Sequence, residues 1–156
     1  MDRFIVNFIF ITILILISVK DIKYKIIPDS FTVGIILLGV IKIFLGYGSF
    51  EKSVIGMGVY PIIFIIIYGY ISDIFKKELI GFGDIKLMGA VGFYKGYTNI
   101  FDIIFVYNTI FIFGFIFILI AFFIKKIGKN TQIPFAPFIS LGFLIFDLWG
   151  NLYEKI

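Results

Sequence analysis

The chemistry open to this chain is narrow, because its 156 residues include no histidine and no cysteine. Their absence excludes Ser-His-Asp and Cys-His catalysis, thiolate zinc sites and histidine-ligated metals. Hydrolysis would then depend on carboxylates, lysine, hydroxyl groups or tyrosine. Among the ten acidic residues, Asp21 follows the first long apolar run and Asp84 precedes a short one. Acidic groups within or beside membrane segments are costly and usually carry function, so these two are the leading candidates.

Asp84 lies in the segment Gly81–Leu87, which reads GFGDIKL. Two glycines just before a carboxylate permit backbone angles closed to other residues and a close approach by another chain. The pattern therefore favours a peptide-binding loop that leads to a carboxylate. It is also typical of a break before a helix whose first turn is capped by Asp84, and the local pattern leaves both interpretations open.

Asp21 begins the segment Asp21–Thr32, which reads DIKYKIIPDSFT. Its local setting among lysines is also typical of a solvated loop carboxylate, so that interpretation stays open beside a catalytic one. Asp29 differs, because it follows Pro28 and directly precedes an apolar run. We predict that Asp29 caps the start of a helix.

The composition indicates that Asp21, Asp84 and Asp29 belong to a protein built from membrane helices. Hydrophobic residues make up 61% of the chain, charged residues 15%, and the mean hydropathy is +1.11. Soluble domains are roughly 45–50% apolar and about 25% charged. A soluble fold of this length cannot bury so much apolar surface, which predicts an all-α polytopic membrane protein. The net charge of +4 is scattered at the ends of apolar runs, so no nucleic-acid partner is expected.

We predict one membrane-embedded domain, residues 1–156, with six membrane segments. A transmembrane helix needs about 20 apolar residues, and the fourth segment is too short to span unaided. The segments are Phe4–Val19, Phe31–Tyr47, Val54–Phe75, Ile85–Lys95, Ile103–Ile124 and Ile133–Trp149.

The distribution of basic residues predicts the orientation. Loops one, three and five carry nine lysines, whereas the other side carries four lysines and arginines. The positive-inside rule then places these loops in the cytoplasm and both termini outside. Asp21 and Asp84 fall on the same cytoplasmic face, although they are 63 residues apart in sequence. If the short fourth segment were only re-entrant, the last two segments would be inverted.

Three stretches together resemble a known family. Asp21–Thr32 resembles the first catalytic segment of type IV prepilin peptidases, and Gly81–Gly92 resembles their G-x-G-D-x-K-L segment. Ile133–Gly142 is similar to a third, late stretch, in which glycine is more usual than Ala136. The stretches occur in the family's order and cover nearly the whole chain.

The resemblance implies that Asp21 and Asp84 are the catalytic pair of an aspartyl endopeptidase at the cytoplasmic membrane face, with no metal and no cofactor. Two carboxyl groups that share one proton can activate water and polarise a peptide carbonyl. The implied substrates are prepilin, pseudopilin or preflagellin-like precursors, in which a short basic leader precedes an apolar helix. The resemblance implies site-supporting or substrate-contacting roles for Gly81, Gly83, Lys86, Pro28, Pro134 and Pro137.

The chain also departs from many bacterial members, which carry an N-terminal four-cysteine motif and an N-methyltransferase activity. This sequence starts almost directly at the first catalytic segment and has no cysteine. We therefore expect a protease-only form without methyltransferase activity, similar in extent to preflagellin peptidases.

Other interpretations of the sequence stay open. A small transporter or channel subunit would use Asp21 and Asp84 in an ion path, but such proteins often have repeated halves and acids near the midplane. No repeat is visible here, and both acids lie near one rim. Lys86 is expected to favour ionisation of the pair or to contact lipid phosphates.

Several further positions have a predicted structural role. Gly89, Gly92 and Gly96 recur near one side of the short segment and permit close helix approach, to a substrate or within the protein. Asp102 and Asp147 are expected at the interface on the outer side.

Overall fold

The computed structural model describes residues 3–76, 80–124 and 133–153, and this part of the chain contains helices and no strand. The predicted all-α class is therefore confirmed. The helices in chain order are α1 (Arg3–Tyr24), α2 (Asp29–Phe44), α3 (Phe50–Val59), α4 (Ile62–Ile66), the π-helix η1 (Ile67–Ile71), α5 (Ser72–Phe75), α6 (Phe82–Lys95), α7 (Ile100–Phe123) and α8 (Ala136–Tyr153).

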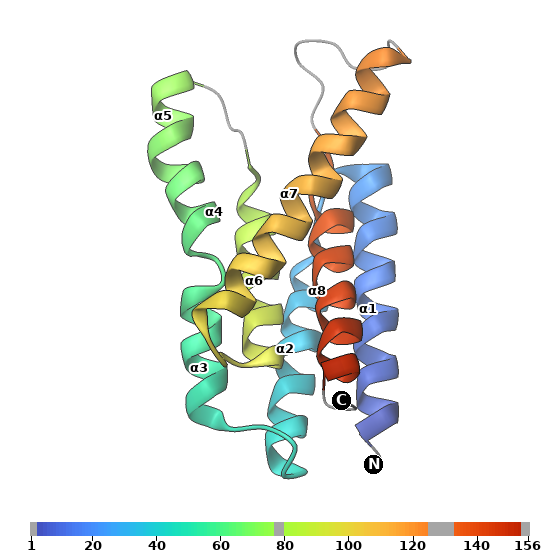
Figure 1. Cartoon of the computed structure of the whole chain (residues 1–156), viewed down its shortest axis with the longest axis vertical. Coiled ribbons are helices and arrows are strands. Elements are labelled where there is room, and N and C mark those ends of the chain that lie inside the picture. The colour runs from blue at the N-terminus through green and yellow to red at the C-terminus, as the bar shows by residue number, and fades with distance from the viewer. Residues whose placement is uncertain (1–2, 77–79, 125–132, 154–156) are drawn as a thin grey trace.

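The described helices correspond to the six apolar runs predicted from the sequence. The third run is not one continuous α-helix. It is divided into α3, α4, η1 and α5, which follow one another end to end (Figure 1). The first break falls at Pro61, which has no backbone N–H and cannot continue the hydrogen bonding of α3. The π-helix η1 then changes the helical pitch once more before α5.

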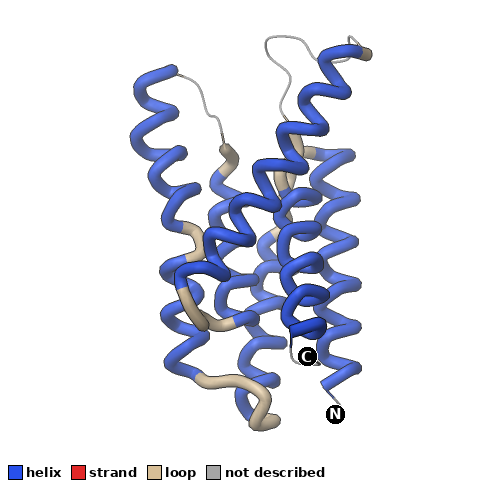
Figure 2. The backbone as a smooth tube through the Cα atoms, in the orientation of Figure 1, coloured by secondary structure: helices blue, strands red, loops and turns tan. Residues whose placement is uncertain are grey.

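The helices cross the bundle in alternating directions, and the loops lie at its two ends (Figures 1 and 2). One end holds the last turn of α1, the start of α6 and the end of α7, whereas the start of α1 and the end of α8 lie at the other (Figure 1). Within the described residues, three helical stretches are long and apolar enough to cross a membrane, namely Arg3–Tyr24, Phe50–Ile74 and Ile100–Phe123.

Helix α6 is short and is enclosed by the rest of the bundle. It packs mainly against α3 and α2, and every residue from Leu87 to Tyr94 is buried. A helix that is apolar all round is typical of such an interior position. It runs from the end that carries Asp84 toward the opposite end (Figure 1), and its 14 residues extend only about 21 Å.

Glycine allows α6 to approach α3 closely. A Cβ atom on Gly92 would lie 2.4 Å from the carbonyl oxygen of Gly56, and one on Gly56 would lie 2.3 Å from that of Gly92. Neither position has room for a larger residue. The close approach predicted for Gly92 is therefore confirmed, and its partner is a helix of this same chain. Gly96 has a different role: it is the C-cap of α6, and its φ of 78° is a conformation that favours glycine.

Candidate active site

Asp21 is held at the start of α8. It lies in the last turn of α1, is buried, and its Oδ2 accepts a hydrogen bond of 3.0 Å from the backbone N–H of Ala136. Ala136 is the first residue of α8, so the carboxyl group faces the positive end of a helix. Pro137 suits the first turn of that helix, where an N–H has no intrahelical partner.

Asp84 lies in the first turn of α6 and is also buried. Its Oδ2 accepts a hydrogen bond of 3.2 Å from the backbone N–H of Gly81. This oxygen therefore caps the start of α6, as one of the two interpretations of the sequence predicted. The Oδ1 of Asp84 is buried and has no hydrogen-bond partner among the described residues. A buried polar atom without a partner is costly, so this oxygen is an unused hydrogen-bond acceptor inside the site.

The two carboxyl groups lie close enough to influence each other. Burial raises the pKa of Asp84 to about 7, and the nearby Asp21 carboxylate contributes to the rise. Asp84 precedes the apolar run Ile85–Lys95 and lies outside the three helices that are long enough to cross a membrane. The two residues share one end of the bundle, as the alternating topology predicted (Figure 1).

The segment that follows Asp21 packs against the start of α6. A Cβ atom on Gly83 would lie 3.2 Å from Cβ of Ile27, which is tighter than most contacts of this kind. Lys86 forms an ion pair with Asp29, the first residue of α2. Gly83 thus allows the close approach of another part of the chain, and the two predicted catalytic stretches are in direct contact.

Two local predictions were wrong. Asp29 does not cap α2, because Pro28 occupies the N-cap position, no side-chain cap is present, and the Asp29 carboxylate pairs with Lys86 instead. Gly81 does not use an unusual backbone angle, since its φ of −75° is open to other residues.

The third predicted stretch reaches the site through its backbone. Pro134 is buried, Ala136 donates to Asp21, and Ser140 accepts a hydrogen bond of 3.0 Å from Ser18 on α1. The hydrogen bond from the Ala136 N–H to Asp21 was not predicted from the sequence. Its only signal was the position of Ala136 between two prolines.

Asp147 and Asp102 lie away from this site. Asp147 forms an ion pair with Lys95, whose side chain is only 9% exposed. The expected position of Asp147 at the outer membrane interface did not include this contact with a buried lysine. Asp102 accepts a hydrogen bond from Thr98, and its backbone N–H donates to Asn99 at the start of α7.

No group of three or more acidic, histidine or cysteine residues is arranged to hold a metal within residues 3–76, 80–124 and 133–153. In each of the two carboxyl groups, Oδ2 accepts a hydrogen bond from a backbone N–H group. Such a pair can move a proton to and from a bound water.

The fold and the site define a helical membrane protein with two buried carboxyl groups at one end of its bundle. A family model described as "Type IV leader peptidase family" matches residues 8–124. The chain belongs to this family, and the resemblance inferred from the three stretches is confirmed.

Characterised relatives agree with this assignment. A prepilin leader peptidase/N-methyltransferase of Legionella pneumophila is 31% identical, over 92% of this chain and 50% of the relative. One of Xanthomonas campestris pv. campestris is 27% identical, over 88% and 47%. A type 4 prepilin-like proteins leader peptide-processing enzyme of Escherichia coli O78:H11 is 29% identical, over 83% and 46%. The chain thus spans about half the length of these relatives, and no solved structure matches it significantly.

Proposed function

We propose that this protein is an aspartyl endopeptidase that removes the basic leader from type IV prepilin-like precursors at the cytoplasmic membrane face. The observation that carries the proposal is the pairing of two buried carboxyl groups, Asp21 and Asp84, at one end of a bundle. The names of the relatives support a leader peptide as the segment removed. A methyltransferase step is not part of the proposal.

Catalysis uses the pair as one unit that holds a single proton near neutral pH. The raised pKa of Asp84 supports this: burial is the main cause of the rise, and the nearby Asp21 carboxylate adds to it, because two close carboxylates resist both being ionised. The ionised carboxylate takes a proton from a water molecule as that water attacks the scissile carbonyl carbon. The protonated carboxyl group polarises the carbonyl oxygen and then protonates the leaving amine. The pair titrates together, so neither aspartate is assigned as acid or base alone.

The backbone contacts suit this cycle. The Ala136 N–H fixes Oδ2 of Asp21, and the Gly81 N–H fixes Oδ2 of Asp84. Each carboxyl group therefore keeps its orientation while its second oxygen handles water and substrate. Fixed donors of this kind lower the reorganisation that the reaction needs.

The surroundings suit a precursor with an apolar helix. Ile22, Ile26 and Phe82 are more than half exposed beside the two aspartates. An apolar helix that docks laterally on this surface would bring its basic leader to the same end of the bundle. The scissile bond would then lie next to the carboxyl pair.

Co-expression with a candidate precursor tests the proposal, with N-terminal sequencing of the product to identify the cleaved bond. Asp21→Asn and Asp84→Asn should each abolish cleavage while the protein still inserts in the membrane. Asp29→Asn is the matched control, because that carboxylate is exposed and pairs with Lys86, and it should retain most activity. Normal processing by either catalytic variant would refute the mechanism, and complete loss in the control would show that the wrong aspartate was assigned.

A further inference from the structure

A basic cavity lies at the end of the bundle opposite Asp21 and Asp84. It has a volume of about 310 Å³ and lies where α2 ends, α3 begins and α6 ends. None of the described acidic residues contributes to its lining. Its polar side chains are Lys42, Lys52, Lys95, Ser49, Ser53, Thr98, Tyr47 and Tyr97.

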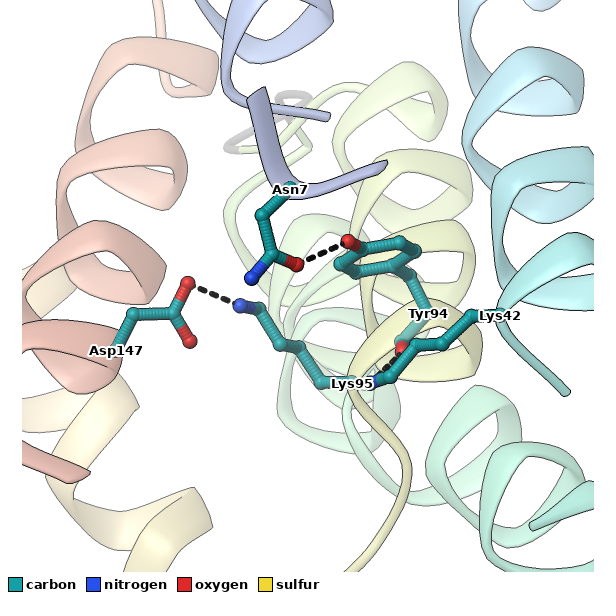
Figure 3. Close-up of polar contacts among 5 residues, drawn as sticks. All are labelled: Asn7, Lys42, Tyr94, Lys95 and Asp147. Carbon is teal, nitrogen blue, oxygen red and sulfur yellow. Dashed lines mark hydrogen bonds and ion pairs between the residues drawn. The ribbon is translucent and has the colours of Figure 1, made fainter. Parts of the chain in front are cut away.

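Two of these three lysines have no acidic partner among the described residues. Lys95 is neutralised by Asp147, but Lys42 donates only to the carbonyl oxygen of Tyr94, at 3.0 Å (Figure 3). Lys52 forms no hydrogen bond or ion pair with its side chain in the described part of the chain. An ammonium group has three donors, so both lysines retain donors for a ligand in the cavity.

The internal network also holds the Lys42 side chain at the cavity. The Tyr94 hydroxyl donates to Asn7 on α1, so the residue whose carbonyl accepts from Lys42 is itself tied to a neighbouring helix (Figure 3). The Lys42 ammonium also lies 5.0 Å from the centre of the Tyr94 ring. A cation held in place by such contacts loses less conformational entropy when it binds an anion.

The start of α3 adds donors to the same cavity. Ser49 is the N-cap of this ten-residue helix, and its side chain makes no capping hydrogen bond. The first N–H groups of a helix have no intrahelical partner and favour a negative charge. The cavity therefore combines the ammonium groups of Lys42 and Lys52, which form no ion pair within the described residues, with hydroxyl groups and the N-terminus of α3, whose first turn also carries Glu51. Ammonium, hydroxyl and helix N–H groups are donors that a phosphate group can use.

Apolar side chains beside the cavity indicate where this phosphate comes from. Phe44, Phe50 and Phe101 are 86%, 67% and 76% exposed at the same end of the bundle, and Tyr47 lines the cavity itself. Aromatic residues concentrate at the level of lipid headgroups in membrane proteins. A phosphate bound here would thus carry acyl chains that cover the exposed phenylalanines.

We propose that this cavity binds the phosphate group of an anionic phospholipid. The headgroup lies against Lys42 and Lys52, and its acyl chains lie along the apolar ends of α2 and α3. Bound lipid joins α2, α3 and α6 at the end of the bundle that does not carry the aspartates. The site is separate from the carboxyl pair, so its occupancy does not depend on the proposed peptidase activity.

Equilibrium binding of an acyl-chain-labelled phosphatidylglycerol to the purified full chain in detergent tests the proposal. Lys52→Gln should weaken binding about fivefold, the effect of roughly one basic residue near a membrane surface. The double variant with Lys42→Gln should weaken it about 25-fold if the effects add. Lys23→Gln, an exposed lysine near Asp21, is the matched control and should bind as the wild type does.

Lys52→Gln is the decisive variant, because its side chain has no partner to lose within the described residues and its unfolding temperature without lipid should be unchanged. Equal binding by wild type and Lys52→Gln, or equal weakening by Lys23→Gln, would overturn the proposal. Two further experiments use inorganic phosphate as a competitor and labelled phosphatidylcholine as an alternative ligand. If inorganic phosphate displaces phosphatidylglycerol as effectively as unlabelled phosphatidylglycerol does, the site takes a free anion and the lipid assignment fails. Equal affinity for phosphatidylcholine would also refute it.

Discussion

Replacing Gly56 by alanine perturbs the contact between α3 and α6, and α6 carries Asp84. The new Cβ atom would lie 2.3 Å from the carbonyl oxygen of Gly92, whereas ordinary contact begins at 3.4 Å. The neighbouring atom belongs to the backbone, so no side chain can move aside. The two helices must therefore separate by about 1 Å, the difference between these two distances.

The cost follows from two opposing effects. Overpacking of this kind costs about 1–3 kcal/mol, while alanine in place of glycine inside a helix gains about 0.5–1 kcal/mol. We expect Gly56→Ala to lower the free energy of unfolding by up to about 2.5 kcal/mol. A shift of about 1 Å at a catalytic group can also lower activity about a hundredfold.

Gly58→Ala is the matched control, because it lies on the same helix and a Cβ atom there has no neighbour within 4 Å. It should stabilise the protein slightly and leave cleavage unchanged. Unfolding in detergent and the rate of precursor cleavage would be measured for both variants. If Gly56→Ala is as stable and as active as Gly58→Ala, the close contact between α3 and α6 does not exist as described.

Three more predictions concern the site. The value of kcat/KM should fall as the pH rises through about 7, because the pair then loses the single proton that it must keep; a rate that stays constant well above that pH would contradict the shared proton. Lys86→Gln should lower activity only a few-fold, because an exposed ion pair with Asp29 contributes at most about 1 kcal/mol; a complete loss would indicate a direct role. Metal chelators should leave cleavage unchanged, and inhibition that added metal reverses would refute a reaction that uses carboxyl groups alone.

The sequence predicted the helices well, because apolar runs and their interruptions are a direct consequence of the bilayer. It also predicted that Asp21 and Asp84 share one end of the bundle, since helices that cross in alternation bring every second loop to the same side. The break at Pro61 and the π-turn of η1 were missed, because the apolar pattern runs through both without a gap.

The contacts between distant segments could not be predicted in the same way. Gly56 gave no signal, since its role depends on which helix packs against it. The hydrogen bond from Ala136 to Asp21 uses a backbone group, which no residue type encodes. Asp29 has the sequence signature of a helix cap, but Lys86, 57 positions later, provides a charged partner for its carboxylate.

The claim that Asp21 and Asp84 act as one unit is tested most directly by a double-mutant cycle. The rate of precursor cleavage in a single turnover would be measured for Asp21→Asn, Asp84→Asn and the double variant, at matched amounts in the membrane. Residues that act as a unit are strongly non-additive. We predict that each single variant loses as much activity as the double variant. Losses that multiply, or near-normal cleavage by either single variant, would contradict a shared catalytic pair.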